Sequence, residues 1–456
     1  MKQLLLSLIF FGSVGAMAQT TFEEDSTMIR NIYSEVLAHG ECHENLRVLC
    51  KDIGARLSGS AEADQAIAWG KALLENYGFQ NVHLQEVEVP HWVRGEGEYG
   101  YFESAGERHP TNICALGGSV GCSGVITAEV VEVKTFEELE ALGRERIEGK
   151  IVLFNRPMDP LLINTGAAYG GAYNQRGQGA SEASRYGAAA VLVRSLTHAL
   201  DTFPHTGGMH YDDDVERIPA AAISTVHASE LSEALKRDPK LRYTLYLGCQ
   251  RFEDKMQANV IGELPGSVYP EEYIVVGGHL DSWDIGEGAH DDGAGIVQSI
   301  EVLRALQALD VPLKRTLRVV LYINEENGNN GGETYARVAR ETGMNHYAAI
   351  ESDAGGFTPR GFRLQGNDEQ YEVMKTWQPL FEPYNVHLFK RGFSGVDIGP
   401  LKNDTTALFG LVPDGQRYFD YHHSNRDTFE NVNKRELELG AATIASLVYL
   451  VDRRGW

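Results

Sequence analysis

Seven ionisable side chains are concentrated among glycines in the stretch GGHLDSWDIGEGAHDDGAG, residues 277–295. They are His279, Asp281, Asp284, Glu287, His290, Asp291 and Asp292. The stretch follows the apolar run YIVV, residues 273–276, which is typical of a buried strand. Ligand sites of α/β proteins lie at the carboxyl ends of strands, so the pattern indicates a metal site, an acid–base pair or an ordinary acidic loop.

Three later segments also bring histidine or carboxylate side chains to the end of an apolar run. Glu325 and Glu326 follow TLRVVLYI, Asp353 ends YAAIESD, and His423 precedes the last expected helix. Strands and helices alternate in this half of the chain, which favours a parallel βαβ sheet. Each motif is common by itself, whereas the whole ordered set rarely arises by chance. Because parallel strands share one edge at their carboxyl ends, we expect these side chains to meet there.

Five of these side chains suit two divalent metal ions that share one ligand. A carboxylate can bridge two cations about 3.5–4 Å apart. Mixed imidazole and carboxylate ligands suit zinc, with cobalt or manganese as substitutes. We expect Asp291 to be the bridge. His279 and Asp353 would then complete one site, and Glu326 and His423 would complete the other.

Two further acids beside these ligands suit supporting and catalytic roles. Asp281, two residues after His279, can accept the imidazole N–H and so fix the tautomer of the ring. Glu325 is adjacent to a ligand without being one, so it is free to act as general acid and base on the water between the metals. We interpret His290 and His422 as loop residues, because neighbouring side chains diverge.

The ordered motifs resemble the co-catalytic zinc aminopeptidase and glutamate carboxypeptidase superfamily, and within it the carboxypeptidase Q family. GGHLDSWDIGEGAHDDGAG, NEENG, ESDAG and HHSNRDT are similar to the motifs of that family, although Asn425 and Arg426 depart from them. VLVRS, PHTG and IPAAAIS, between residues 191 and 224, resemble its inserted protease-associated domain. The resemblance covers nearly the whole chain after residue 18.

The resemblance implies a phosphorylase/hydrolase-like α/β fold, with a mixed, largely parallel sheet flanked by helices. The peptidase domain would comprise residues 19–118 and 253–456, and residues 119–252 would form the inserted protease-associated domain. The family also implies two zinc ions per chain on the five ligands named above, Glu325 as general acid/base, a cis peptide bond between Asp291 and Asp292, and often a homodimer. The implied reaction is hydrolysis of small unblocked peptides, dipeptides especially.

Composition and the N-terminus predict an exported protein. MKQLLLSLIFFGSVGAMA, residues 1–18, has the charge, apolar core and small residues of a signal peptide. No later run reaches the roughly 20 apolar residues of a membrane-spanning helix, so we expect a secreted or periplasmic protein. A net charge of −23 argues against nucleic acid or an anionic membrane as partner. Five cysteines fit an oxidising compartment, and Cys114 and Cys122 are able to pair across a flexible loop.

Other functions stay open at this point. A dizinc aminopeptidase or an amidohydrolase would use the same metal chemistry, whereas a glutaminyl cyclotransferase of this fold would use one zinc. A non-catalytic protease-associated binding protein would not need the ligand set. His205 of PHTG could reach the site from the insertion, and Asp397 could bind a substrate amino group, although loop and turn roles are commoner for such residues.

Overall fold

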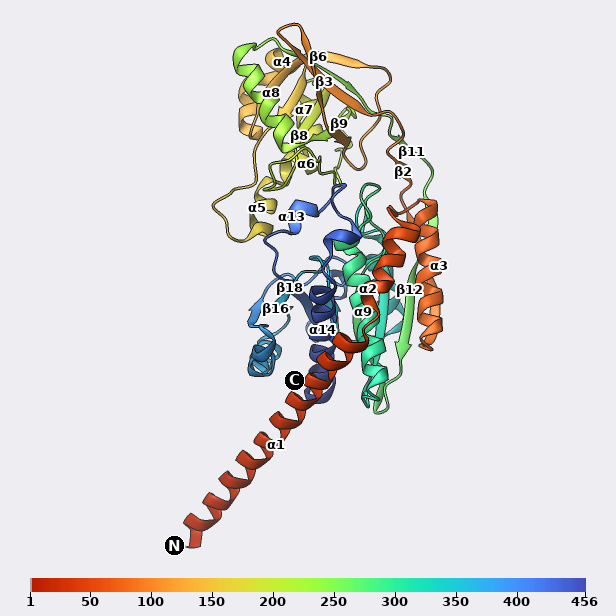
Figure 1. Ribbon diagram of the computed structural model, residues 1–456, viewed down its shortest axis with the longest axis vertical. Helices are drawn as coiled ribbons and strands as arrows, with labels where there is room; N and C mark the ends of the chain where they lie inside the picture. The colour runs from red at the N-terminus through yellow and green to blue at the C-terminus, as the bar shows by residue number, and fades with distance from the viewer. Residues whose placement is uncertain (1) are drawn as a thin grey trace.

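The protein consists of two stacked lobes, each built on its own β-sheet (Figure 1). This computed structural model describes the backbone of residues 2–456 and the side chains of residues 21–456. The predicted signal peptide, residues 1–18, lies outside the residues whose side chains are described. The lobe that contains both chain ends is called the main lobe below, and the other is called the inserted lobe.

The main lobe contains an eight-stranded sheet of order β1-β12-β14-β13-β15-β18-β16-β17. Its strands are β1 (Gln80–Val89), β12 (Lys255–Leu264), β13 (Tyr269–His279), β14 (Arg315–Tyr322), β15 (Asn345–Glu351), β16 (Pro359–Gln365), β17 (Leu388–Arg391) and β18 (Ala407–Pro413). The four central strands, β14, β13, β15 and β18, are parallel, whereas β1 with β12, β12 with β14 and β16 with β18 are antiparallel. The predicted fold class, a mixed, largely parallel sheet flanked by helices, is confirmed.

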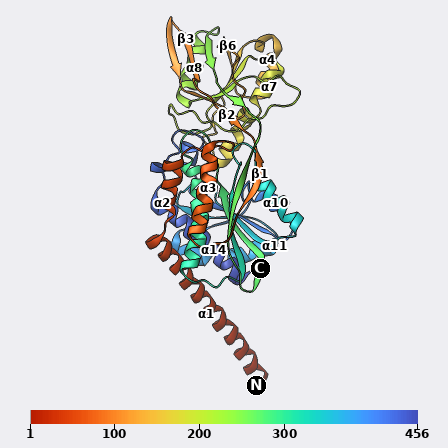
Figure 2. The same ribbon diagram turned by 90° about the vertical axis from the view of Figure 1, so that its right-hand side faces the viewer.

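Helices cover both faces of this sheet, because its central strands are apolar on both sides. In β13, Ile274 and Val276 pack in one core cluster with α1, α2, α3, α9 and α14, and Val275 packs in a second cluster with α10. Figure 2 shows α3 and α10 on opposite sides of the sheet. The helices of this lobe are α1 (Lys2–His39), α2 (Cys42–Arg47), α3 (Ala61–Asn76), α9 (Ala294–Ala308), α10 (Asn330–Thr342), α11 (Asp368–Thr376), α12 (Gln378–Phe381), α13 (Tyr418–Tyr421) and α14 (Lys434–Arg454).

The inserted lobe contains a second eight-stranded sheet, of order β4-β3-β10-β6-β7-β8-β9-β5. Its strands are β3 (Tyr99–Ser104), β4 (Glu107–Thr111), β5 (Ile113–Ala115), β6 (Ile126–Val133), β7 (Ile151–Phe154), β8 (Ala190–Arg194), β9 (Ala220–Ile223) and β10 (Arg242–Tyr246). α4 and α7 pack on one face and α8 packs on the other. The helices are α4 (Phe136–Ile147), α5 (Thr165–Ala172), α6 (Asn174–Gly177), α7 (Gly179–Arg185) and α8 (Thr225–Arg237).

We expected the insertion to begin at residue 119. Three strands that precede this residue nevertheless belong to the second sheet. β3, β4 and β5 precede that residue and yet pair in the second sheet, with Tyr99 opposite Tyr246 for example. The alternation within a short strand does not indicate which sheet it joins, because that depends on partners far along the chain. We therefore propose that the inserted lobe runs from about Tyr99 to Tyr246. β2 (Trp92–Val93) pairs with β11 (Gln250–Arg251) where the chain passes between the lobes.

Neither a membrane-spanning helix nor a disulfide bond occurs among the described residues. None of the described helices is long and apolar enough to cross a bilayer. All five cysteines are free thiols, so Cys114 and Cys122 are not linked. Burial raises the pKa of the Cys114 thiol to about 12, so this group is not a reactive thiolate.

Candidate active site

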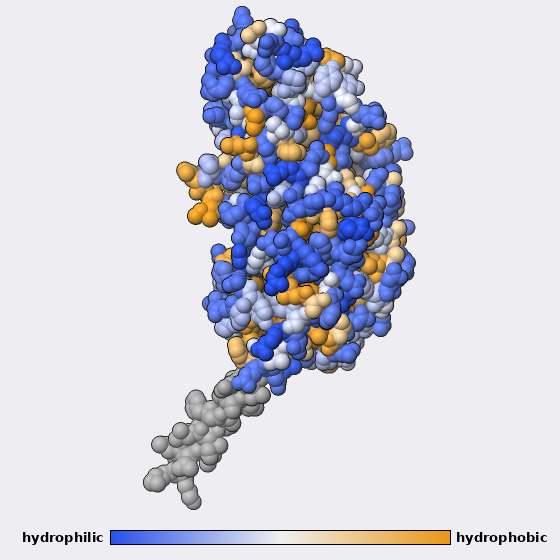
Figure 3. All heavy atoms as spheres, viewed as in Figure 1, coloured by the Kyte–Doolittle hydropathy of each residue, from blue (hydrophilic) through white to orange (hydrophobic). Residues whose placement is uncertain are grey.

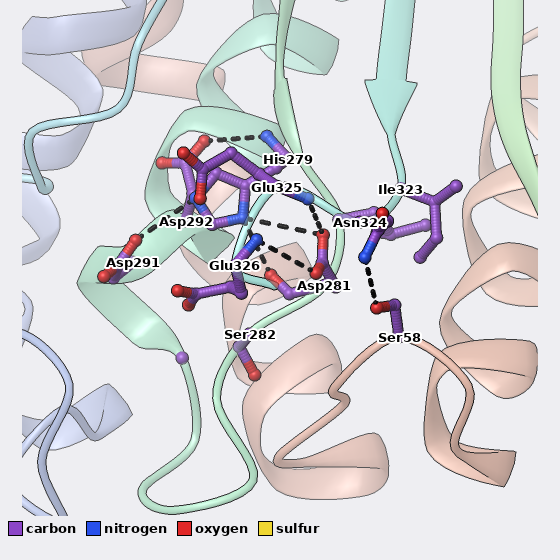
Figure 4. Close-up of polar contacts among 12 residues, drawn as sticks. Ser58, His279, Asp281, Ser282, Asp291, Asp292, Ile323, Asn324, Glu325 and Glu326 are labelled. Carbon is purple, nitrogen blue, oxygen red and sulfur yellow. Dashed lines mark hydrogen bonds and ion pairs between the residues drawn. The ribbon is translucent and has the colours of Figure 1, made fainter. Parts of the chain in front are cut away.

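The five predicted ligands arrive at the carboxyl edge of the main sheet. His279 is the last residue of β13, Glu326 follows β14 and Asp353 follows β15. Asp291 lies in the short π-helix η2 (Ala289–Gly293), and His423 follows α13. β13 lies between β14 and β15, so three of the five side chains come from adjacent parallel strands. Figure 4 shows His279, Asp291 and Glu326 converging in front of these strand ends.

Each histidine of the cluster turns one ring nitrogen toward carboxylates. His279 Nε2 lies 3.2 Å from Asp291 Oδ1 and 3.5 Å from Asp353 Oδ1. His423 Nε2 lies 3.2 Å from Asp291 Oδ2 and 3.2 Å from Glu326 Oε2. Asp291 Oδ2 is buried and forms no well-directed hydrogen bond with any described residue. Asp291 therefore turns Oδ1 toward His279 and Oδ2 toward His423.

The other nitrogen of each ring lies near a main-chain oxygen. His279 Nδ1 is 3.0 Å from the Asp281 carbonyl oxygen, and His423 Nδ1 is 3.3 Å from the Thr206 carbonyl oxygen. A neutral imidazole that donates its N–H there presents a lone pair at Nε2. A lone pair among buried carboxylates is unfavourable unless a cation lies between them. Since imidazole nitrogen and carboxylate oxygen are zinc donors, the residues of this cluster fit a zinc site.

The loop that presents Asp291 is held by side chains that bind its backbone. The Asp291–Asp292 peptide bond is cis, as the family resemblance predicted. The Asp292 carboxylate accepts hydrogen bonds from the main-chain N–H groups of His279 and Gly295, and one of its oxygens lies within 4.8 Å of donor atoms of His279 and Asp353. Asp427 accepts a hydrogen bond of 3.1 Å from the Asp291 N–H. These bonds fix the direction in which the Asp291 carboxylate points.

A buried guanidinium stabilises the same region. Arg56 is fully buried, and its side chain donates hydrogen bonds to the main-chain oxygens of Gly54, Leu280, Glu287 and Gly288. Burial lowers the pKa of Arg56. We did not single out Arg56 or Asp427 from the sequence, because both act on main-chain atoms, which leave no residue pattern. Asp427 lies within the HHSNRDT motif, which was the one available signal.

Asp281 supports the site in a different way from the one we expected. Its carboxylate lies 3.8 Å from His279 Nδ1, and the nearer acceptor for that ring is the main-chain oxygen of Asp281. The carboxylate instead accepts hydrogen bonds from the main-chain N–H groups of Glu325 and Glu326 (Figure 4). The reason is that the loop after β14 directs its N–H groups toward the end of β13. Asp281 thus connects the His279 strand with both glutamates.

Glu325 lies beside the donor cluster (Figure 4), and its neighbour Glu326 turns one carboxylate oxygen toward His423. Glu326 Oε1 accepts a hydrogen bond from the Trp283 N–H, which leaves Oε2 facing His423. Burial raises the pKa of Glu325 to about 8; the nearby His279 opposes this shift and the charge of Asp353 adds to it. A carboxyl group whose pKa is close to neutrality can both accept and donate a proton.

The inserted lobe takes part in the site through the loop after Pro204. The Thr206 carbonyl oxygen faces His423 Nδ1, and the Thr206 N–H donates to the His423 carbonyl oxygen. Arg176, which is also buried, places Nη1 3.3 Å from the same Thr206 oxygen. His205 Nδ1 lies 2.7 Å from the His422 carbonyl oxygen, so His205 supports the segment that carries the ligand and does not join the donor cluster.

Two histidines interpreted as loop residues differ in their surroundings. His290 is buried, stacks on Phe357 at 4.2 Å and has hydrogen-bond partners at both ring nitrogens, so its role is structural. His422 lies nearer the ligands than we expected, with Nε2 3.6 Å from Asp291 Oδ2 and its ring stacked on His423. The φ of His423 is 59°, and this left-handed backbone turns the two neighbouring rings to the same side.

Asp397 does not have the turn-capping role that is commoner for such residues. It is fully buried, and its carboxylate forms no hydrogen bond with any described residue, so it does not cap a turn. Burial, together with the charge of Glu351, raises its pKa well above the usual range.

A cleft of about 920 Å³ opens beside Asp353 between the two lobes. The main lobe contributes β16, β17, β18 and α13 to its walls, and the inserted lobe contributes residues 163–167. Just before α5, Leu161 and Ile163 are 86% and 85% exposed. This segment lies at the apolar protrusion on the left of the mainly hydrophilic face in Figure 3. The cleft offers a substrate direct access to one end of the ligand cluster.

Comparison with known proteins identifies the family. Residues 259–448 match the family described as Peptidase family M28. The chain is 36% identical over 415 residues to carboxypeptidase Q from Bos taurus, an alignment that covers 91% of this chain and 86% of that protein. The chain belongs to peptidase family M28. Human carboxypeptidase Q is likewise 36% identical, over the same shares of the two chains.

Solved structures confirm the fold of this M28 peptidase. The peptidase M28 precursor from Shewanella amazonensis superimposes with a TM-score of 0.90 at 30% identity, over 94% of this chain and 97% of that one. A zinc aminopeptidase from Bacillus subtilis has a TM-score of 0.64 at 20% identity, over 90% of this chain and 94% of that one, and shares the fold. The M28 peptidase is thus an enzyme whose ligand cluster lies in a known peptidase fold.

Proposed function

We propose that this M28 peptidase is an exported exopeptidase with two zinc ions per chain, which hydrolyses small unblocked peptides, dipeptides especially. The observation that carries the proposal is the arrangement of His279 and His423, each of which faces one oxygen of Asp291. Asp353 and Glu326 complete the two donor sets. Bound zinc ions would polarise the scissile carbonyl and make water more acidic. The relatives named carboxypeptidase Q support peptide substrates.

Glu325 is the general acid and base in this proposal. Its carboxylate accepts a proton from water as the water oxygen attacks the carbonyl carbon of the peptide bond. It then delivers that proton to the amine nitrogen as the C–N bond breaks, so that one acid and one amine are released. Asp281 positions Glu325 by accepting a hydrogen bond from its main-chain N–H. His279 and His423 keep their N–H groups on main-chain oxygens and their Nε2 atoms toward the donor cluster.

An aminopeptidase is the second candidate. A probable leucine aminopeptidase 2 from Aspergillus oryzae is 28% identical over 59% of this chain. The choice depends on which end of the peptide enters the cleft beside Asp353. A one-zinc cyclotransferase is less well supported, because it would leave part of a five-donor cluster without a cation.

The first experiment combines metal analysis with a substrate panel. The purified enzyme should contain two zinc ions per chain and lose activity on chelation. Free dipeptides should be hydrolysed, whereas N-acetylated and C-amidated dipeptides separate aminopeptidase from carboxypeptidase action. Full activity with a single zinc per chain would refute the dinuclear proposal.

The second experiment separates the roles of the two neighbouring glutamates. Glu325→Gln should lower kcat by about 10²–10⁴-fold, since Gln cannot shuttle a proton. Its zinc content should stay at the wild-type value, because Glu325 is not a proposed ligand. Glu326→Gln is the matched control and should weaken one zinc site. If Glu325→Gln loses zinc while Glu326→Gln keeps both ions and loses only rate, the two roles are reversed.

A further inference from the structure

The cleft beside Asp353 is basic although the chain as a whole is acidic. Arg363 of β16 and Lys390 and Arg391 of β17 line it, and Asp353 is the only acidic residue among its described lining residues. The whole chain has 41 Lys and Arg residues against 64 Asp and Glu residues. An average stretch of this surface would therefore carry more acids than bases, and the cleft carries the reverse.

Arg363 and Lys390 lack an acidic partner. They lie directly opposite each other on neighbouring parallel strands, where like charges destabilise the sheet. Within residues 21–456, neither side chain forms an ion pair or hydrogen bond, whereas Arg391 pairs with Asp368. A lysine on the edge strand β17 also discourages pairing with another chain. That reason does not apply to Arg363, since β16 has neighbours on both sides.

The strand register connects this pair to the ligand cluster. Glu351 of β15 lies opposite Gly410 of β18, and Gly410 lies opposite Arg363. Strands are about 4.8 Å apart, so the Cα atoms of Arg363 and Glu351 are about 10 Å apart. Asp353 follows Glu351 by two residues. Because extended peptide spans about 3.3–3.6 Å per residue, a group bound by Arg363 lies within about three residues of a peptide bond at the cluster.

We propose that Arg363 and Lys390 bind a carboxylate of the peptide substrate. The inference rests on the proposed peptidase function and adds the chemical group that the substrate presents. Guanidinium and ammonium groups both bind carboxylates through charge-assisted hydrogen bonds. The carboxylate is the C-terminus of a short peptide or the side chain of an Asp or Glu near the scissile bond. In either case the preference for the charged substrate weakens as salt concentration rises, because both side chains are exposed.

The test measures kcat/KM of wild type and of the double variant Arg363→Met/Lys390→Met on matched substrates. The pairs are Ala-Ala with its C-terminal amide, Ala-Glu with Ala-Gln, and Glu-Ala with Gln-Ala. On the peptide that carries the bound carboxylate, the double variant should lose about 10–100-fold, the range expected for hydrogen bonds to a charged group. On the matched peptide that lacks this carboxylate, the double variant should equal wild type. Arg146→Met, at an exposed and unpaired arginine on α4 in the described inserted lobe, is the matched control and should leave every ratio unchanged.

Each outcome bears on the proposal. A loss confined to peptides with a free C-terminus, or confined to peptides with a glutamate side chain, supports the proposal and identifies the carboxylate. No loss on any peptide overturns it, and so does an equal loss on Ala-Ala and its C-terminal amide combined with an equal loss on both members of each Glu/Gln pair. If wild type hydrolyses none of these peptides, the proposed function fails separately. Calorimetric binding of the same peptides to wild type and double variant then still tests the subsite.

Discussion

Gly207→Ala should remove one of the two proposed zinc ions and leave the other bound. Gly207 follows Thr206 in the inserted lobe and has a φ of +135°, which alanine adopts only with strain. A β-carbon at this position would lie 2.3 Å from Nη1 of Arg176 and 2.7 Å from Nδ1 of His423. Both contacts are too short, so the imidazole, the guanidinium or the loop has to move.

The displacement is larger than a zinc site accommodates. Ordinary contact begins near 3.4 Å, so His423 has to withdraw by about 0.7 Å unless the loop retreats. Zinc–ligand distances vary by only about 0.2 Å. Loss of the contacts that orient a ligand typically lowers metal affinity about 10–100-fold. We expect at least this loss at the site of Glu326 and His423, and no change at the site of His279 and Asp353.

Zinc titration against a competing chelator measures the two affinities, and peptide hydrolysis should fall with the weaker site. Gly208→Ala is the matched control, since a β-carbon there meets only the Glu326 carbonyl oxygen, at 3.4 Å. Retention of the first zinc shows that Gly207→Ala has folded. The reasoning is refuted if Gly207→Ala binds two zinc ions with wild-type affinity and keeps full activity, because His423 would then not depend on the inserted lobe.

Three further changes test other parts of the structure. Asp281→Ala removes the acceptor for the Glu325 and Glu326 N–H groups, so zinc affinity should fall about 10–100-fold. Asp281→Asn should retain part of the zinc affinity. Unchanged zinc binding in Asp281→Ala would contradict the positioning role. Arg56→Met leaves main-chain oxygens of the ligand loop without a donor, so the free energy of unfolding measured in urea should fall by about 3 kcal/mol or more. A loss below about 1 kcal/mol would count against this stabilising role of Arg56. His346→Gln tests acid stability: burial, assisted by the charge of Arg318, lowers the pKa of His346 to about 4, whereas that of the unfolded chain is about 6.5. Between these two pKa values the unfolded chain binds more protons than the folded chain. The free energy of unfolding should therefore fall by up to about 3 kcal/mol as pH drops from about 6.5 to 4. His346→Gln should reduce this pH dependence, which thermal unfolding at pH 7 and pH 5 measures.

The sequence by itself determined the type of fold and which side chains meet at the carboxyl edge of its sheet. His279, Glu326 and Asp353 each follow an apolar run, and strands that are apolar on both sides have to be covered by helices on both faces. Parallel strands in such a sheet end at one edge, so side chains placed directly after them meet without any further information.

Only the tertiary structure decided what holds those ligands in place. The Thr206 carbonyl oxygen beside His423 and the N–H groups bound by Asp281 and Asp427 are main-chain atoms, which every residue type supplies and no motif marks. The side to which His422 turns depends on a left-handed backbone at the following residue, and β3 joins the second sheet through a partner strand far along the chain. Such features depend on which distant segments come together in space, and local residue types do not specify this.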